Sequence, residues 1–183
     1  AVFWMWMIAF LGSATAFIEA CLAQVYKRNI NGEYRGGPAY YFEKALEREP
    51  NNFYALFGMA DCYRGMNQQF KSIEYWNRIL ELDPNNKVIL TRAGDAFRTT
   101  GNFEKAVEYY TKALNIDFDI YAAIGLALIC KAEGRFDEAI ERFSNLIKDD
   151  PKNARLYVDL AECYAQCSKT EEAIRVLETY TKI

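Results

Sequence analysis

The side chains that most often carry enzyme chemistry are scarce in this sequence. It contains no histidine, which is the commonest general base and the commonest metal ligand. Its five cysteines include no Cys-x-x-Cys pair, and their odd number argues against a disulfide framework. Cys163 and Cys167 lie four residues apart on one face of a predicted helix; we interpret them as buried packing residues, with a metal or redox pair as the alternative. No phosphate loop or nucleophile motif is visible, so we predict no enzyme, no cofactor and no metal site.

The charge balance also argues against a nucleic-acid partner. The chain has 183 residues, with 22 basic and 25 acidic side chains and a net charge of −3. A nucleic-acid-binding protein usually carries a basic patch or stripe, and none is apparent here. We therefore expect protein or peptide partners.

The elements that would position any binding residues recur with a fixed period. One small side chain returns at intervals of 34, 33 and 34 residues, at Ser72, Ala106, Ala139 and Ala173. A second marker ends successive segments at intervals of 34, 34 and 33 residues, at Pro50, Pro84, Phe118 and Pro151. A period of this length predicts stacked helical hairpins, each too small to bury its apolar face alone.

The hairpin over residues 87–116 shows the pattern most clearly. Apolar residues at three- and four-residue steps predict helices over 87–100 and 103–116, and Gly101-Asn102 supplies the turn between them. The small residues Gly94 and Ala106 would let the two backbones approach closely. Asn85-Asn86 follows Pro84 and can cap the first of these helices.

These residues resemble the tetratricopeptide repeat family. The resemblance rests on recurring positions such as Gly94, Phe97, Gly101, Phe103, Ala106, Tyr110 and Ala113. Two departures are visible: Phe118 stands where proline is usual, and residues 65–70 read as carrying about two extra residues. The resemblance implies an all-α, right-handed solenoid over residues 38–183, with half a hairpin followed by four hairpins, that acts as a protein–protein interaction scaffold.

The resemblance also implies a concave groove lined by the first helix of each hairpin. By register, the groove residues expected to contact a partner are Met59, Asp95, Arg98, Tyr121, Lys131, Arg155 and Glu162. Tyr121 would act as an anchor, and Arg98, Lys131 and Arg155 would meet acidic groups. The alternative is an ordinary solvated surface.

A different kind of segment precedes the repeats. The first 18 residues carry no charge, and the apolar character extends to Val25, which matches the roughly 20 residues that a membrane-crossing helix needs. We therefore expect a transmembrane-like helix over 1–26 and a polar loop over 27–37, with residues 1–25 as a candidate membrane contact. Lys27, Arg28 and Arg35 follow this segment, so the repeats would face the cytoplasm from the cytoplasmic membrane. A cytoplasmic location is the alternative.

Residues 1–46 resemble the sodium:alanine (amino acid carrier) symporter family. Phe3-Trp4-Met5-Trp6 is similar to a signature helix of that family, and residues 31–41 are similar to the loop and helix start that follow it. This resemblance implies an alternative function, a fragment or fusion of a sodium-coupled alanine/glycine symporter with an accessory repeat region. We assign no transport residue, because a single helix cannot enclose a binding site between membrane repeats.

The carboxyl end keeps an apolar face. Ile174, Leu177, Tyr180 and Ile183 follow helical spacing where a solenoid normally adds a polar capping helix. We expect either truncation of the chain at this point or self-association through the last helix.

Overall fold

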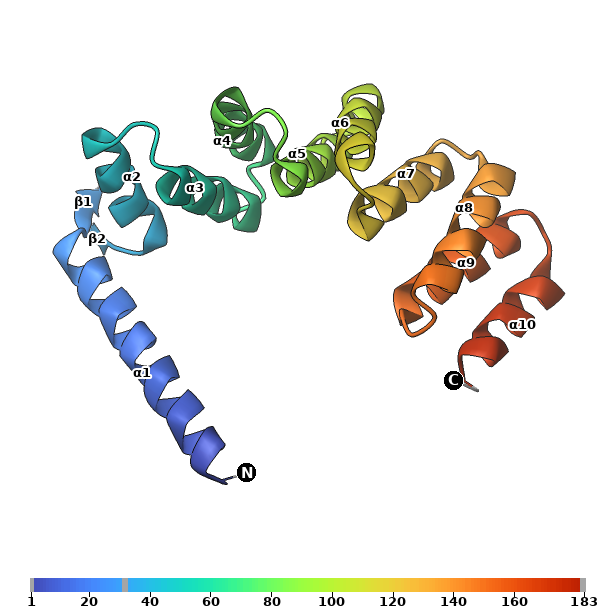
Figure 1. Cartoon of the computed structure of the whole chain (residues 1–183), viewed down its shortest axis with the longest axis horizontal. Coiled ribbons are helices and arrows are strands. Elements are labelled where there is room, and N and C mark those ends of the chain that lie inside the picture. The colour runs from blue at the N-terminus through green and yellow to red at the C-terminus, as the bar shows by residue number, and fades with distance from the viewer. Residues whose placement is uncertain (1, 31–32, 182–183) are drawn as a thin grey trace. The chain divides into compact units, whose positions relative to one another are not determined.

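The computed structural model describes residues 2–30 and 33–181, apart from the side chains of residues 2–11, 28, 30 and 33–35 (Figure 1). The chain forms two compact units, Ala1–Pro84 and Asn85–Ile183. Ten helices and one two-stranded sheet make up the described part of the chain. The prediction of an all-α chain is therefore confirmed except for this small sheet.

The first unit contains a long helix, a β hairpin and three shorter helices. Their bounds are α1 (Val2–Val25), β1 (Arg28–Ile30), β2 (Glu33–Arg35), α2 (Pro38–Arg48), α3 (Phe53–Gly65) and α4 (Gln69–Leu82). Within the residues that the structure describes, no helix is both long and apolar enough to cross a membrane. The transmembrane character expected of residues 1–26 is therefore not confirmed.

The hairpin replaces part of the loop predicted over residues 27–37. Its strands are antiparallel, with Asn29 opposite Tyr34 and Ile30 opposite Glu33. The sequence between them is Asn31-Gly32, which favours a two-residue hairpin connection, although both residues lie outside the described part. The polar loop predicted over residues 27–37 did not include these two strands.

Helix α2 packs on α3 through a residue pair of complementary size. A Cβ atom added at Gly58 would lie only 2.3 Å from Phe42 Cε2, so the ring occupies the space that a side chain would need. The centre of the unit is closed by Trp76, which is fully buried and contacts Phe57 edge-on. Ser72 fits here although alanine is usual, because its hydroxyl donates a 2.9 Å hydrogen bond to the Ala60 carbonyl.

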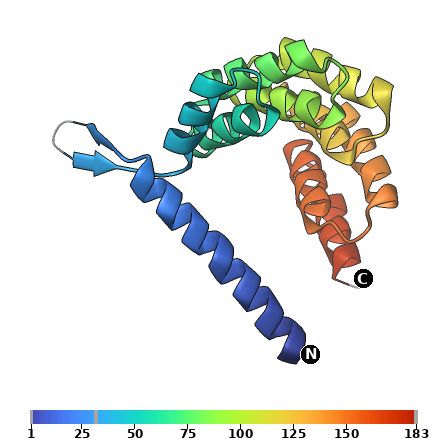
Figure 2. The ribbon, with the colours of Figure 1, turned by 60° about the vertical axis from the view of Figure 1, so that its left-hand side comes forward.

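The second unit consists of three helical hairpins that follow one another along the chain (Figure 2). Their bounds are α5 (Lys87–Thr99), α6 (Phe103–Ile116), α7 (Ile120–Ala132), α8 (Phe136–Asp149), α9 (Ala154–Gln166) and α10 (Thr170–Tyr180). The helices predicted over 87–100 and 103–116 are confirmed to within one residue.

All four hairpin turns share one design. Each has three residues, and the middle position has a positive φ in Asn67 (57°), Gly101 (78°), Gly134 (75°) and Ser168 (59°). The two extra residues expected within 65–70 are therefore absent, and that prediction is wrong. Gly65 ends α3 and does not belong to the turn, while Asn67 adopts the left-handed conformation that asparagine tolerates better than most residues.

A single tyrosine fills the centre of the second unit. Tyr110 on α6 is fully buried. A Cβ atom at Gly94 on α5 would lie 2.7 Å from its ring, and one at Gly125 on α7 would lie 2.3 Å from it. The two glycines therefore let one ring pack against both first helices, and this packing fixes α5 beside α7.

Candidate functional site

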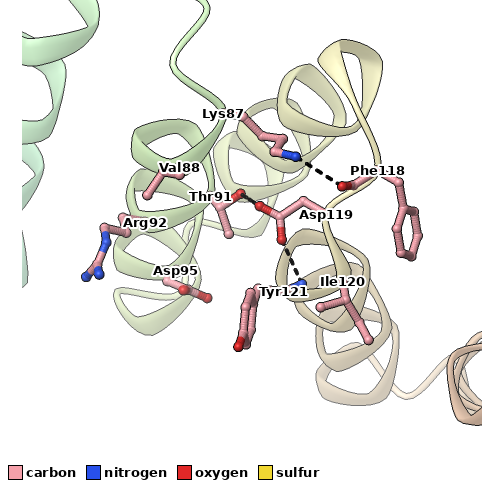
Figure 3. A pocket seen from close by; sticks show the side chains of 9 residues that line it. All are labelled: Lys87, Val88, Thr91, Arg92, Asp95, Phe118, Asp119, Ile120 and Tyr121. Atoms are coloured by element: carbon pink, nitrogen blue, oxygen red, sulfur yellow. Dashed lines mark hydrogen bonds between the residues drawn. The ribbon is translucent and has the colours of Figure 1, made fainter. Parts of the chain in front are cut away.

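A groove of the second unit lies between α5 and the start of α7 (Figure 3). It has a volume of about 660 Å³ and is lined by Lys87, Val88, Thr91, Arg92, Asp95, Phe118, Asp119, Ile120 and Tyr121. These residues come from α5, from the segment that leads into α7 and from the first two positions of α7. The groove therefore lies on the face formed by the first helices of two successive hairpins.

Asp119 organises the floor of this groove. Its Oδ1 atom accepts hydrogen bonds from the backbone N–H groups of Tyr121 (2.9 Å) and Ala122 (3.4 Å), which caps α7. Its Oδ2 atom accepts a 2.9 Å hydrogen bond from Thr91 Oγ1 on α5. Thr91 is only 5% exposed, so this bond lies under the groove and joins the two helices.

Lys87 closes one end of the groove. Its Nζ atom donates to Asp117 Oδ2 (2.8 Å) and to the backbone carbonyl of Phe118 (3.2 Å). The hydrogen bond from Lys87, together with one from the Phe118 backbone, lowers the pKa of the Asp117 carboxyl. The charge of Lys87 is thus already matched within the chain.

The rim of the groove is apolar and exposed. Val88 is 52% exposed, Phe118 is 57% exposed and Tyr121 is 70% exposed. Phe118 occupies the marker position at which proline ends the neighbouring segments, so this departure from the repeat pattern adds an aromatic ring to the rim. Side chains of this size stay open to solvent here although the hairpin core beneath them is closed.

Asp95 and Arg98 meet at the hydroxyl of Tyr110. Asp95 Oδ1 accepts a 2.7 Å hydrogen bond from this hydroxyl, and Arg98 Nε donates a 3.3 Å hydrogen bond to the hydroxyl oxygen of Tyr110. Arg98 Nη2 also lies 3.6 Å from Asp95 Oδ1. Burial, reinforced by the charge of Asp95 and its hydrogen bond, raises the pKa of Tyr110 well above its ordinary value.

Lys131, Asp159 and Glu162 form a second charged cluster, between α7 and α9. Lys131 Nζ donates a 2.7 Å hydrogen bond to Asp159 Oδ1 and a further bond to Glu162 Oε2. Partial burial opposes the charged form of Lys131, but the two carboxylates outweigh it and raise its pKa. Asp159 is 7% exposed, and its other oxygen lies 3.7 Å from Nε of the exposed Arg155.

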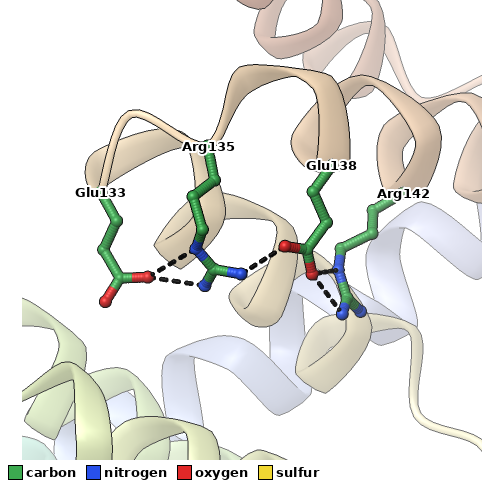
Figure 4. Close-up of polar contacts among 4 residues, drawn as sticks. All are labelled: Glu133, Arg135, Glu138 and Arg142. Atoms are coloured by element: carbon green, nitrogen blue, oxygen red, sulfur yellow. Dashed lines mark hydrogen bonds and ion pairs between the residues drawn. The ribbon is translucent and has the colours of Figure 1, made fainter.

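A surface ion-pair chain holds the turn between α7 and α8 (Figure 4). Arg135 Nη2 lies 2.6 Å from Glu133 Oε2, and Arg135 also bonds Glu138. Arg142 donates to Glu138 Oε1 at 2.8 Å, and this hydrogen bond is the main cause of the lowered pKa of Glu138. Exposed pairs of this kind contribute little each, so we assign this chain to the local turn and not to a site.

Six of the seven predicted groove residues fall into three groups, and Met59 is considered after them. Asp95 and Tyr121 line one groove, as the register indicated. Arg98 and Lys131, which were predicted to meet acidic groups of a partner, already have bonding partners within the chain. Arg155 is exposed, and Glu162 is exposed although it binds Lys131.

The prediction that Met59 lines the groove is wrong. It is only 2% exposed and belongs to the core of the first unit. The two residues wrongly counted as an insertion shifted the register of α3 by two positions. The residue that corresponds to Asp95, 34 positions earlier, is Asp61, and it pairs with Arg64 as Asp95 pairs with Arg98.

Asp119, Thr91 and Asp159 make bonds that position other parts of the site, and the site prediction did not include them. Asp119 precedes the first apolar residue of a predicted helix, and this placement is a recognisable capping signal. Thr91 lies on α5, which lines the groove, but this residue is buried and its hydroxyl donates to Asp119. No signal in the sequence identifies Asp159 as the partner of Lys131, because the pairing depends on how α7 meets α9.

Comparison with protein families confirms both resemblances. Tetratricopeptide repeat models match residues 89–120 and 131–183, and the model of the sodium:alanine symporter family matches residues 1–90. Neither of these is a family of enzymes.

The similar curated proteins are amino-acid carriers over a short segment. YrbD of Bacillus subtilis, named as a sodium/proton-dependent alanine carrier, is 67% identical over 46 residues, which are 25% of this chain and 10% of that protein. The sodium/alanine symporter AgcS of Methanococcus maripaludis is 53% identical over 47 residues, again 25% of this chain and 10% of the relative. The chain thus spans about a tenth of the length of these relatives.

The similar solved structures are repeat proteins. A crystal structure of MamA gives a TM-score of 0.71 at 21% identity and covers 80% of this chain and 86% of that one. A tetratricopeptide repeat protein from Parabacteroides merdae gives 0.71 at 23% identity, over 79% of this chain and 57% of that one. At these identities the likeness shows the fold, a solenoid of tetratricopeptide type.

Proposed function

We propose that this chain is a protein-interaction scaffold that binds an extended peptide segment of a partner in the groove between α5 and α7. The observation that carries the proposal is the exposed apolar rim formed by Val88, Phe118 and Tyr121 beside a concave surface. The polar floor beneath it is already hydrogen-bonded, so a partner that covers the rim buries apolar area without stranding Thr91 or Asp119. Aromatic side chains in such a position commonly dominate binding energy.

The arrangement of the helices favours a peptide as the bound element. Val88 and Tyr121 lie 33 residues apart and occupy corresponding positions on α5 and α7, so both face the same groove. A groove of about 660 Å³ accommodates a few side chains. Proteins with tetratricopeptide repeats generally bind protein partners, and this supports the assignment.

The proposal is tested by selecting ligands for the groove and then removing its rim. A random dodecapeptide library displayed on phage is selected on the full chain, and the selected peptides are measured by fluorescence anisotropy. We expect Tyr121→Ser to weaken their binding at least tenfold. Phe70→Ser removes a ring that is 73% exposed on α4 and should leave binding unchanged. Equal binding to Tyr121→Ser and the unaltered chain, or a failure to select any peptide, would refute the proposal.

A second candidate function rests on the carrier similarity. The chain would then be a fragment or fusion of a sodium-coupled alanine/glycine carrier, with residues 1–25 at the cytoplasmic membrane and the helical pairs on the cytoplasmic side. The sequence identity to carriers supports this candidate over the amino-terminal quarter. Co-flotation with phosphatidylglycerol-containing liposomes tests it: the full chain should float and a chain beginning at Gly36 should not. Equal behaviour of the two chains would exclude a membrane contact through residues 1–25.

A further inference from the structure

We infer that the α5–α7 groove selects a peptide with a basic side chain next to an apolar one, and that Asp95 and Tyr121 receive the basic group. This inference rests on the proposed function and adds the chemistry of the partner. It depends on which charges of the groove are already satisfied within the chain.

Two cations in or beside the groove, Lys87 and Arg98, already have partners within the chain. Lys87 is bonded to Asp117 and to the Phe118 carbonyl. Arg98 is bonded to Tyr110 and lies beside Asp95. Figure 3 shows Arg92, the remaining cation of the lining, extending away from α7. Among the described residues of the groove lining, an acidic peptide would therefore meet no unbonded cation beside Tyr121.

Asp95 presents an open acceptor at the same place. Its side chain is 47% exposed, and its contacts with Tyr110 and Arg98 both involve Oδ1. The Oδ2 atom is thus left for a donor from a partner, as judged from the described residues of this unit. The Asp119 carboxylate, by contrast, already accepts three hydrogen bonds and does not compete for the same group.

Tyr121 supplies the second half of the recognition. Its ring is 70% exposed, and Figure 3 shows it across the groove from Asp95. A lysine or arginine head group over the face of a tyrosine ring is attracted by the ring quadrupole. The aliphatic part of the same side chain, or an adjacent apolar residue, would contact Val88 and Phe118 on the rim. A carboxylate and an aromatic face on opposite walls therefore favour a basic group flanked by apolar surface.

Three labelled decapeptides test the inference on the full chain by fluorescence anisotropy. One contains leucine beside two arginines, the second contains leucine beside two glutamates, and the third keeps the arginines but has serine in place of leucine. We expect the first to bind at least tenfold more tightly than either of the others. Its affinity should fall as salt is raised, because part of the attraction is between exposed charges.

Two matched substitutions locate the effect. Asp95→Asn should weaken binding of the arginine–leucine peptide about fivefold, while it keeps an oxygen that can accept from Tyr110. Asp149→Asn makes the same change of charge at an exposed position of α8, outside this groove, and should leave binding unaltered. Equal effects of the two substitutions would overturn the role of Asp95.

The outcomes separate this inference from the proposed function. Equal or tighter binding of the glutamate–leucine peptide would overturn the basic preference and leave the scaffold function standing. The inference would fail in the same way if none of the three peptides bound while library-selected peptides did. The absence of binding by both sets of peptides would count against the groove itself.

Discussion

Thr91 Oγ1 donates a 2.9 Å hydrogen bond to Asp119 Oδ2, so a side chain of α5 holds the carboxylate that caps α7. This bond couples the stability of one hairpin to the geometry of the next. It also places Tyr121, two residues after Asp119, at the edge of the groove.

The first prediction concerns this cap. Asp119→Ala removes the acceptor for Thr91 and for two backbone N–H groups, so the free energy of unfolding should fall by about 1–2 kcal/mol. Asp119→Asn keeps an acceptor for the cap and should cost about half as much. Urea denaturation followed by circular dichroism measures both. A loss below about 0.3 kcal/mol for Asp119→Ala would show that the cap does not hold α7.

A second prediction concerns the close contact between α7 and Tyr110. Gly125→Ala places a Cβ atom 2.3 Å from a fully buried ring that has no room to move, so it should destabilise the chain by about 1–3 kcal/mol. Gly65→Ala is the control, because nothing lies within 4 Å of its Cβ position. That helical substitution should be neutral or stabilising by up to about 1 kcal/mol. Similar losses for the two variants would contradict the packing argument.

A third prediction concerns the charged cluster between α7 and α9. Lys131→Met removes the close cation of the Asp159 carboxylate, which is 7% exposed, and leaves it only the exposed Arg155 at 3.7 Å, so we expect a loss of about 2–3 kcal/mol. Adding Asp159→Asn to that variant should restore part of the stability, since it removes the uncompensated charge. Glu162→Gln breaks only the exposed pair and should cost less than about 1 kcal/mol. Thermal and urea unfolding of the four proteins decide the ranking.

Alkaline pH should destabilise the chain through Tyr110. Burial and the neighbouring Asp95 raise the pKa of this phenol above its ordinary value of about 10. The unfolded chain therefore loses the proton at lower pH than the folded chain does. The contribution to stability is complete below about pH 10 and is lost as the pH rises beyond it.

Unfolding free energies measured from pH 8 to pH 11 check this pH dependence. The unaltered chain should lose stability more steeply above about pH 10 than Tyr110→Phe does. Burial also raises the pKa of Tyr75 and Tyr109, so the variant should keep a smaller slope. Identical slopes would rule out Tyr110 as a contributor.

The hairpin turns give a fifth prediction. Ser168 has a φ of 59° at a position where Gly101 and Gly134 are found in the neighbouring hairpins. Ser168→Gly relieves this strain and should stabilise the chain by about 0.5–1 kcal/mol, after allowance for the greater freedom of glycine in the unfolded chain. Asn67→Gly should gain less, because asparagine tolerates the conformation. Calorimetry that shows a lower melting temperature for Ser168→Gly would contradict this prediction.

The sequence predicted the helices well because the repeat imposes the same physical pattern several times. Gly101 and the apolar steps around it located α5 and α6 to within one residue. The pattern failed where one residue type substitutes for another in the same conformation. Asn67 takes the left-handed turn position that glycine usually occupies. The two extra residues predicted within 65–70 shifted the register of α3, and this shift placed the buried Met59 in the predicted groove.

The groove could be predicted only in part. Tyr121 and Asp95 were found because a repeating register places them on one face. Lys131 pairs with Asp159, 28 residues later, and Arg98 pairs with Tyr110, 12 residues later. Both pairs depend on how different helices pack against each other. Side-chain spacing along one helix carries no information on such pairs. The intrachain partners of Arg98 and Lys131 could therefore not be predicted.

The contact between Phe42 and Gly58 shows that the segment similar to carriers and the packed helices of the repeat region overlap in this chain. The match to the carrier family runs to residue 90, inside α5. Within that match, Phe42 on α2 packs against Gly58 on α3 in the same way that Tyr110 packs against Gly125 on α7. No single cut can therefore separate a carrier-like piece from an intact stack of helices. An expression boundary placed after α2 would uncover an interface, so any shortened version should begin ahead of Pro38.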